Sequence, residues 1–281
     1  MATAAVAAPA ALAAPSGPVH PGVQTFTGGG QCTANFIFRG AGATYIGQAA
    51  HCASTGAATD TNGCTAASKP IGTPVTVDGA SRPGTMVYNS WLAMQARGEK
   101  NADVCAYNDF ALVKLHPDDV GRVDPTVPGF GGPNGVGGAR GGATVFSSGN
   151  SSLRGGLRQL RPKQGLVAQV AGNGWSRSVY TVTPGVPGDS GSGFMNGRGQ
   201  AIGVLSTLAL APLPLSNGVS DLAKQLTYLR SVAGFGGVRL VNGTRPFKAN
   251  LGRAILGSLK APRLGPAPRG SRGLSGLLGR Q

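Results

Sequence analysis

Three short segments of this chain carry residue types that together could perform nucleophilic catalysis. His51 lies in Ala-Ala-His-Cys, Asp109 in Asn-Asp-Phe-Ala-Leu-Val-Lys-Leu, and Ser190 in Pro-Gly-Asp-Ser-Gly-Ser-Gly. A serine hydroxyl is a poor nucleophile at neutral pH, so hydrolysis by serine needs an imidazole to take its proton and a carboxylate to orient that imidazole. The three residues could supply these roles.

The order of these residues along the chain excludes two scaffolds. An α/β-hydrolase places its acid and its histidine after a G-x-S-x-G serine, whereas His20, His51 and His116 all precede Ser190 and are the only histidines. A subtilisin-like order needs an aspartate before the histidine, and the first acidic residue is Asp60. We expect His116 to end a strand at the surface and to belong to no site.

Taken together, the three segments resemble the motifs of the chymotrypsin (trypsin-like) serine endopeptidase family, in particular its secreted actinobacterial members. They occur in the family's order, 58 and 81 residues apart, and the resemblance covers roughly residues 25–235. Gly-Asp-Ser-Gly alone would mean little in a chain with 48 glycines. The resemblance implies an all-β fold of two six-stranded antiparallel Greek-key barrels (chymotrypsin-like) with a C-terminal helix, and a serine-type endopeptidase that needs no cofactor and no metal.

The resemblance also assigns a role to each residue. His51, Asp109 and Ser190 would form a catalytic triad, and the backbone N–H groups of Gly188 and Ser190 would form the oxyanion hole. Each residue has a non-catalytic interpretation as well: His51 as a packed or surface histidine, Asp109 as a turn residue before a strand at 110–115, and Ser190 as a turn serine among glycines. The presence of all three motifs in one order favours catalysis.

Asp189, directly before the expected nucleophile, needs a positive partner, because burying an unpaired carboxylate is costly. The chain has no Ile-Val-Gly-Gly type sequence whose new N-terminus could pair with it. Bacterial relatives often carry an arginine for this purpose in the strand that resembles residues 144–149 of this chain. Ser147 stands at the position of that arginine. We predict that Arg154 supplies the charge instead.

Four cysteines allow three pairings, and the resemblance selects Cys32–Cys52 and Cys64–Cys105. Zinc binding is the competing interpretation, but the chain has no C-x-x-C and the one histidine beside a cysteine is already assigned to the triad. Disulfides are typical of an oxidising compartment. We therefore predict a secreted protein, either extracellular or associated with the cell wall.

The N-terminal sequence has one feature of an export signal and lacks another. Residues 1–24 are predicted to be a signal or leader segment, because an apolar, alanine-rich stretch at 2–14 ends in a small-residue cleavage site before Ala14. The basic n-region is missing, since the first Lys or Arg is Arg39, and a disordered Ala/Pro leader is the alternative.

The remaining boundaries place one barrel on each half of the chain. We assign residues 25–123, with His51 and Asp109, to an N-terminal barrel and 124–238, with Ser190, to a C-terminal barrel. With 48 glycines, 20 prolines and 12% charged residues, the composition suits short strands joined by tight turns. Helical periodicity is convincing only at 220–230, where Ser220 could cap a helix whose buried face would hold Leu222, Gln225, Leu226 and Leu229.

Charge is concentrated at the C-terminus. Residues 239–281 contain nine basic and no acidic residues, out of a net charge of +15 for the chain. Such a tail is too rich in Gly, Pro and Ser to pack, so we predict that it is disordered. It is either a solvated extension or a contact with anionic surfaces. We expect a monomer that does not bind nucleic acid and does not span a membrane, because the most apolar stretch, 201–215, is broken by two prolines.

Substrate preference follows from the resemblance alone. The side chain before the scissile bond should meet a floor near Thr183 and Pro184 and a wall carrying Ser206 and Leu208. No acid is present there, so we predict cleavage of proteins or peptides after small or medium apolar residues. Two alternatives stay open: a catalytically inactive homologue acting as a binding module, and an esterase on the same scaffold.

Overall fold

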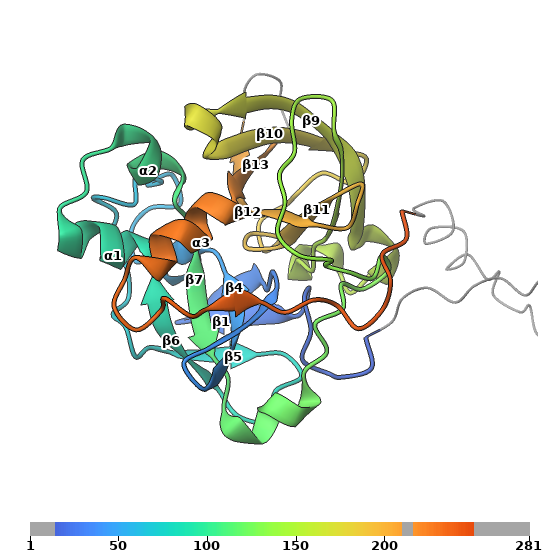
Figure 1. The fold of residues 1–281 in the computed structure, drawn as a ribbon, viewed down its shortest axis with the longest axis horizontal. Helices are drawn as coiled ribbons and strands as arrows, with labels where there is room; N and C mark the ends of the chain where they lie inside the picture. Colours follow the sequence, from blue (N-terminus) through green and yellow to red (C-terminus); the bar gives the residue numbers. More distant parts are fainter. Residues whose placement is uncertain (1–14, 210–215, 250–281) are drawn as a thin grey trace, which may run out of the picture.

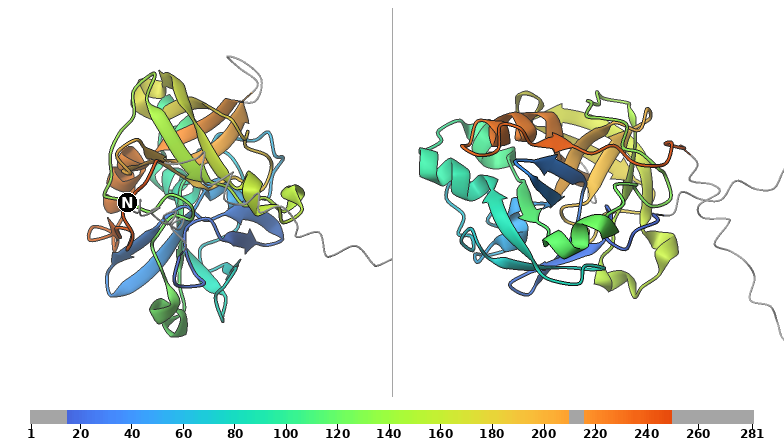
Figure 2. Two further views of the ribbon diagram at one scale, coloured as in Figure 1. Left: turned by 90° about the vertical axis from the view of Figure 1, so that its right-hand side faces the viewer. Right: turned by 60° about the horizontal axis from the view of Figure 1, so that its bottom comes forward.

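Antiparallel strands dominate the structure. This computed structural model describes residues 15–209 and 216–249. Its strands form two units, an eight-stranded sheet built mainly from the first half of the chain and a closed six-stranded barrel built from the second half. In Figure 1 the barrel lies above and the sheet below, and the left view of Figure 2 shows both units from the side. The predicted all-β class with a C-terminal helix is confirmed.

The N-terminal unit contains eight strands where six were expected. They pair in the order β14-β3-β4-β7-β6-β5-β1-β2. A turn at Gly28 and Gly29, with φ of 58° and 93°, separates β1 from β2, and β14 comes from beyond the C-terminal helix to pair with β3. The strands are β1 (Gln24–Thr27), β2 (Gly30–Thr33), β3 (Ile37–Gly40), β4 (Ala43–Gln48), β5 (Pro74–Val77), β6 (Gly84–Asn89), β7 (Ala111–Lys114) and β14 (Arg239–Leu240).

The C-terminal unit is the closed barrel that the sequence predicts. Its strands pair around the ring in the order β10-β13-β12-β11-β8-β9. Inward-facing apolar side chains fill it, among them Val145, Phe194 and Ile202. The strands are β8 (Thr144–Ser148), β9 (Pro162–Ala171), β10 (Ser176–Thr181), β11 (Gly193–Asn196), β12 (Ala201–Ala209) and β13 (Ser216–Asp221).

One apolar cluster joins the two units. It contains Phe38 and Leu112 from the sheet, Phe146 and Val204 from the barrel, and the buried face of α3 (Leu222–Arg230). Burial of apolar surface from both units in a single cluster fixes the position of one unit against the other. This is the packing that brings the His51 and Ser190 segments to one cleft.

The C-terminal helix has its predicted buried face, since Leu222, Gln225, Leu226 and Leu229 are all buried. Its cap differs from the prediction. Asp221, one residue after Ser220, has the extended backbone of an N-cap and accepts a hydrogen bond from Lys224 N at 2.8 Å. Ser220 lies one residue before this cap and pairs with Ser176 of β10.

Two further α-helices, α1 (Ser90–Arg97) and α2 (Ala102–Tyr107), were not predicted. They begin at Asn89 and Asn101, whose side chains accept hydrogen bonds from the first backbone N–H groups. With eight and six residues they are too short for a clear apolar period. The described chain also contains short 3-10 helices at η1 (Ala50–Ala53), η2 (Pro117–Arg122), η3 (Ser152–Arg154), η4 (Arg158–Leu160) and η5 (Gly172–Gly174).

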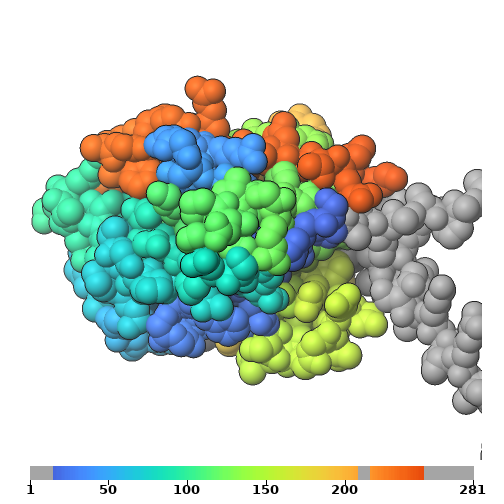
Figure 3. Space-filling view, turned by 90° about the horizontal axis from the view of Figure 1, so that it is seen from below, coloured from blue at the N-terminus to red at the C-terminus, as the bar shows by residue number. Residues whose placement is uncertain are grey.

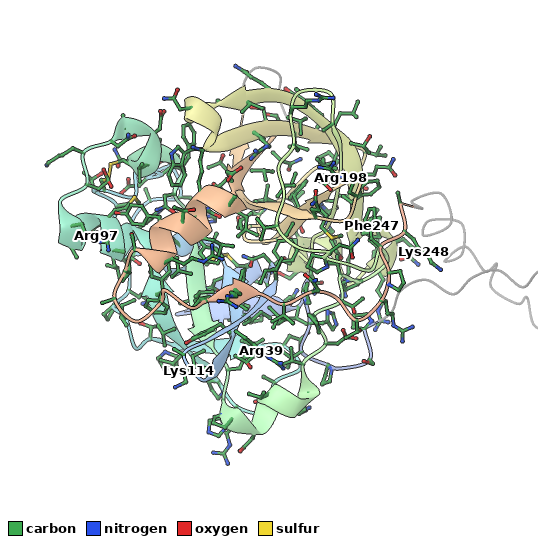
Figure 4. All side chains as sticks on the ribbon, in the orientation of Figure 1. Arg39, Arg97, Lys114, Arg198, Phe247 and Lys248 are labelled. Carbon is green, nitrogen blue, oxygen red and sulfur yellow. A yellow bond between two sulfur atoms is a disulfide. The ribbon has the colours of Figure 1, made fainter. Side chains whose placement is uncertain are left out.

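Both predicted terminal boundaries require correction. Residues 15–24 belong to the fold and not to a leader, because Val19 and Val23 are buried and Val19 forms a bridge with Val123. Residues 239–249 are packed, because Phe247 lies edge-on to Phe146 with ring centroids 5.3 Å apart and Lys248 N donates to Phe130 O at 2.7 Å. Figure 4 shows Phe247 and Lys248 beside the barrel. The predicted cleavage site before Ala14 and the remainder of the basic tail lie outside the described residues.

The segment between β8 and β9 projects from the molecule. It is the yellow-green projection in Figure 3, and Leu153 and Leu157 within it are 73% and 55% exposed. Arg154 lies between them but is turned inward, with 9% of its side chain exposed. Within the described part of the chain, no helix has the length and apolar character needed to cross a membrane.

Candidate active site

His51 and Asp109 form a tight pair at the edge of the N-terminal sheet. His51 lies in η1, directly after β4, and Asp109 precedes β7, the neighbour of β4. The Nδ1 of His51 is 2.7 Å from Oδ2 of Asp109, and the backbone N–H of His51 donates to Oδ1 at 2.9 Å. The side chain of Asp109 is 4% exposed and that of His51 is 26% exposed. Asp109 thus fixes the orientation of the imidazole from its buried side, and part of the ring stays accessible.

Ser206 completes the contacts of this carboxylate. Its hydroxyl donates to Oδ2 of Asp109 at 2.5 Å. The sequence predicted Ser206 as a substrate-binding residue through its place on β12. In the structure its side chain contacts Asp109.

The pair shifts both pKa values. Burial opposes a charged imidazole, but the Asp109 carboxylate outweighs it and raises the pKa of His51 above its ordinary value. Burial likewise favours a neutral Asp109, yet the His51 charge and the hydrogen bonds from His51 and Ser206 lower the pKa of Asp109. Asp109 therefore stays ionised when His51 is neutral, as a group that orients a base must.

Almost every backbone polar group around Ser190 is hydrogen-bonded. On the carbonyl side, Pro187 O accepts from the Ser151 hydroxyl at 2.5 Å, and Gly188 O accepts from the Gln31 amide at 3.0 Å. The remaining carbonyls are also held: Gly188 O by Thr33 Oγ1, Asp189 O by Ser192 N, and Ser190 O by Thr33 N.

Two N–H groups are the exception. The N–H of Asp189 donates to Val186 O and that of Gly191 to Leu205 O, but neither Gly188 N nor Ser190 N has an acceptor among the described residues. In a trans peptide the N–H points away from the C=O. Pro187 O and Gly188 N belong to one peptide group, so the hydrogen bond from the Ser151 hydroxyl to Pro187 O directs Gly188 N–H to the opposite side. Gly188 has φ of 94°, and a Cβ there would overlap the Gln31 side chain. Backbone N–H groups without acceptors are the kind of donor that can stabilise an oxyanion.

His51, Asp109 and Ser190 line one cleft of about 580 Å³, together with Gly188 and Ser206. Among the described residues no hydrogen bond joins the Ser190 hydroxyl to His51. Hydrogen bonds between catalytic groups are often long before substrate binds and tighten in the complex. The structure therefore brings together the predicted triad and oxyanion residues.

Asp189 is fully buried and doubly paired. Arg154 Nη2 and Lys163 Nζ each lie 2.8 Å from its Oδ2. The ion pair predicted from the sequence with Arg154 is therefore present, while Lys163 was missed. Lys163 is fully buried on β9, and a lysine in a strand carries no sequence signal for burial because lysine is almost never buried unless paired.

The groups of this ion pair are shielded from solvent, since Asp189 and Lys163 are fully buried and Arg154 nearly so. Burial favours a neutral Asp189, but Lys163 and Arg154 outweigh it and lower the pKa of Asp189. Burial also lowers the pKa of Lys163, against the pull of the carboxylate. Gly149 lies so close that a Cβ would overlap the carboxylate of Asp189. The Ser190 loop is thereby anchored from behind by two cations.

The predicted floor residues lie next to these cations. Pro184 O accepts from Arg154 at 2.6 Å and from Lys163 at 3.2 Å, and Thr183 O is 3.4 Å from Lys163 Nζ. Neither residue lines the cleft that contains Ser190, whereas Thr207, which was not predicted, does. Leu208 pairs with Asn217 across β12 and β13, and its side chain lies outside the described part of the structure.

Both predicted disulfides are present. Cys32–Cys52 ties η1 to β2, and Cys64–Cys105 ties the segment after η1 to α2. His51, Cys32 and Cys52 have their ligand atoms within 4.8 Å of one another. Because the two sulfurs are bonded to each other, they are not the thiolates that a zinc site requires.

Comparisons with known proteins establish the fold. Among solved structures the chain is similar to Thermobifida fusca Protease A, at 18% identity and a TM-score of 0.51 over 80% of this chain and 99% of that one. A Nocardiopsis protease and a Cellulomonas bogoriensis chymotrypsin, each 18% identical, cover 79% of this chain and 98% of theirs at TM-scores of 0.47 and 0.48. The sequence matches no family model and no curated protein. The fold is chymotrypsin-like.

Proposed function

We propose that this protein is a serine endopeptidase that hydrolyses peptide bonds through an acyl-enzyme intermediate. The observation that carries the proposal is the pair of N–H groups at Gly188 and Ser190, which have no acceptor in the described part of the chain and share one cleft with a His51 that Asp109 orients. A serine, an oriented base and two oxyanion donors are the set that acyl transfer needs.

In the proposed reaction His51 removes the proton of the Ser190 hydroxyl as its oxygen attacks the peptide carbonyl. The developing oxyanion is held by the N–H groups of Gly188 and Ser190. His51 then gives its proton to the departing amine, which leaves an acyl ester on Ser190. Water, deprotonated by His51, attacks the ester and releases the carboxylic acid.

The buried ion pairs of Asp189 support an enzyme that needs no new N-terminus for activity. Arg154 and Lys163 already neutralise Asp189, and the Ser151 backbone N–H donates to its second oxygen at 3.1 Å. The loop that carries Gly188 and Ser190 is thus held by groups from within the chain.

For specificity we propose cleavage after small or medium apolar residues. Thr183 and Pro184 are backed by the side chains of Arg154 and Lys163, which carry two positive charges against one negative charge on Asp189. A net positive charge behind the floor of a pocket repels a Lys or Arg side chain of a substrate. The wall is proposed to be formed by β12, with Ser206, Thr207 and Leu208.

We propose further that the protein acts outside the cell, as a monomer on protein or peptide substrates. The two disulfides support an oxidising compartment. Export by a signal segment and attachment of the basic tail to anionic surfaces stay predictions.

Labelling with a fluorophosphonate tests the proposed function. The probe reacts with a serine only where base and oxyanion donors are assembled, so we expect covalent modification at Ser190, located by mass spectrometry, and none in Ser190→Ala. An unlabelled native protein would favour the inactive binding module. Comparison of matched amide and ester substrates separates the peptidase from the esterase, because an esterase would turn over only the ester.

A further inference from the structure

The part of the cleft formed by the N-terminal half of the chain contains an uncompensated carboxylate. Residues 56–61, shortly after η1, line this part together with Gln31 and Trp91, and Asp60 is the acidic residue among them. Asp60 is half-buried, and its Oδ2 lies against Gly56, where a Cβ would come within 3.3 Å of it. The carboxylate is therefore part of the cleft wall.

No described residue neutralises Asp60. None of the ion pairs formed by the described residues includes it. The other acid that lines the cleft, Asp109, is already bonded to His51 and Ser206. Among the described residues that line the cleft, His51 is the only basic side chain, and it must be neutral for catalysis. A substrate cation would thus meet Asp60 without a competing positive charge in the wall.

The position of Asp60 indicates which substrate residue it contacts. In the proposed function the residue directly before the scissile bond contacts β12 of the C-terminal barrel, where Ser206 and Thr207 line the cleft. The neighbouring substrate residues have to cross the wall formed by the N-terminal half, because Cys52, Gln31, Trp91 and residues 56–61 are the lining groups there. Asp60 therefore acts on a residue that flanks the cleaved bond.

We infer that Asp60 is a specificity-determining residue that selects a Lys or Arg next to the cleaved bond, at a position other than the one directly before it. This inference rests on the proposed function and names the substrate class of that site. The net charge of +15 repels cations at long range, but at physiological salt this field is screened beyond about 8 Å. At contact distance the unpaired carboxylate decides the preference.

Kinetics on a set of quenched fluorescent peptides tests the inference. The set places Lys, Gln or Glu in turn at the second residue before the bond and at the first and second residues after it, with Leu directly before the bond. For a partly exposed ion pair we expect kcat/KM to be about two- to fivefold higher for Lys than for Gln at one of these positions. The kcat/KM for the Glu peptide should be lower than that for the Gln peptide, and 1 M salt should reduce the preference for Lys.

Variants connect the preference to the residue. In Asp60→Asn the Lys-to-Gln ratio should fall to one, and in Asp60→Lys it should invert. Asp78→Asn is the matched control, because Asp78 is exposed after β5 and does not line the cleft. It should keep the ratio of the native enzyme. A Lys preference that survives in Asp60→Asn, or its absence from the native enzyme at all three positions, overturns the inference.

Binding to Ser190→Ala separates this inference from the proposed function. Fluorescence anisotropy with dye-labelled versions of the same peptides should show about two- to fivefold tighter binding of the Lys peptide, lost in the double variant with Asp60→Asn. If the native protein cleaves nothing but this difference is present, the proposed function fails and the Asp60 site stands. Equal binding of Lys, Gln and Glu peptides, or no binding of any, overturns the Asp60 site.

Discussion

Lys163 Nζ lies 2.8 Å from Oδ2 of Asp189, and both side chains are fully buried. With Arg154 on the same oxygen, this pair anchors the loop that carries Ser190. An arginine of η3, within the projecting segment, and a lysine of β9, directly after that segment, therefore converge on one carboxylate. The arrangement predicts that stability and activity depend on the same contacts.

Removing Lys163 should destabilise the protein. Lys163→Met replaces a buried ammonium with an apolar side chain and leaves Asp189 with Arg154 alone, and breaking a buried pair typically costs about 3–5 kcal/mol. We expect a loss toward the lower end, about 3 kcal/mol, in the free energy of unfolding measured with urea. Lys114→Met, on the exposed side of β7 and labelled in Figure 4, is the control and should unfold like the native protein. Equal stability of both variants would contradict the prediction.

Ser151 should influence turnover more than substrate affinity. Its hydroxyl holds Pro187 O and so directs Gly188 N–H toward the oxyanion site. Complete loss of one such donor costs roughly 100- to 1,000-fold in rate, so a loosened donor in Ser151→Ala should lower kcat by about tenfold with little change in KM. Ser151→Thr keeps a hydroxyl and should restore most of kcat. A rise in KM with unchanged kcat would show that Ser151 acts on substrate binding instead.

The loss of activity on acidification should have its midpoint above the ordinary pKa of histidine. Catalysis needs neutral His51, and Asp109 raises its pKa, so kcat/KM should fall as pH drops through a midpoint above about 6.5. The stabilisation from protonated His51 has the opposite sense. It is complete below about pH 6.5 and is lost as pH rises through the raised pKa.

A pH profile of kcat/KM on one peptide checks the catalytic part of this prediction. An acid limb below pH 6 in the native enzyme would mean that burial of His51 outweighs the Asp109 charge.

Loss of the Ser206 hydroxyl in Ser206→Ala removes a donor to Asp109 and should reduce kcat/KM about tenfold, within the range for a hydrogen bond to a charged group.

The residue directly before the scissile bond should be apolar. Peptides with Ala, Val or Leu at this position should be cleaved at least tenfold faster than those with Lys or Arg, because Arg154 and Lys163 lie behind Thr183 and Pro184. A tenfold ratio corresponds to about 1.4 kcal/mol. Relative kcat/KM on peptides that differ only at this residue provides the measurement, and a preference for Lys or Arg would reject the proposed pocket.

Several features of the site could be predicted because they depend on residue type and order. The order of His51, Asp109 and Ser190 excluded other hydrolase scaffolds, and the need to neutralise Asp189 pointed to Arg154. The buried face of α3 followed from its period. Val19 and Phe247 were misassigned because composition marked their segments as leader and tail, while a few apolar side chains decide whether such segments pack.

The sequence by itself determined the chemistry that this chain can perform, since it sets which nucleophile, base and acid are present and in which order. Only the tertiary structure decided that Lys163 is buried against Asp189, that Ser206 contacts Asp109, and that Asp60 lines the cleft. It also decided that Gly188 N and Ser190 N find no acceptor within residues 15–209 and 216–249. These relationships join residues far apart in the chain, and they arise from packing of the two units around one apolar cluster. Local sequence patterns do not predict such contacts, because burial and hydrogen bonding are properties of the folded arrangement.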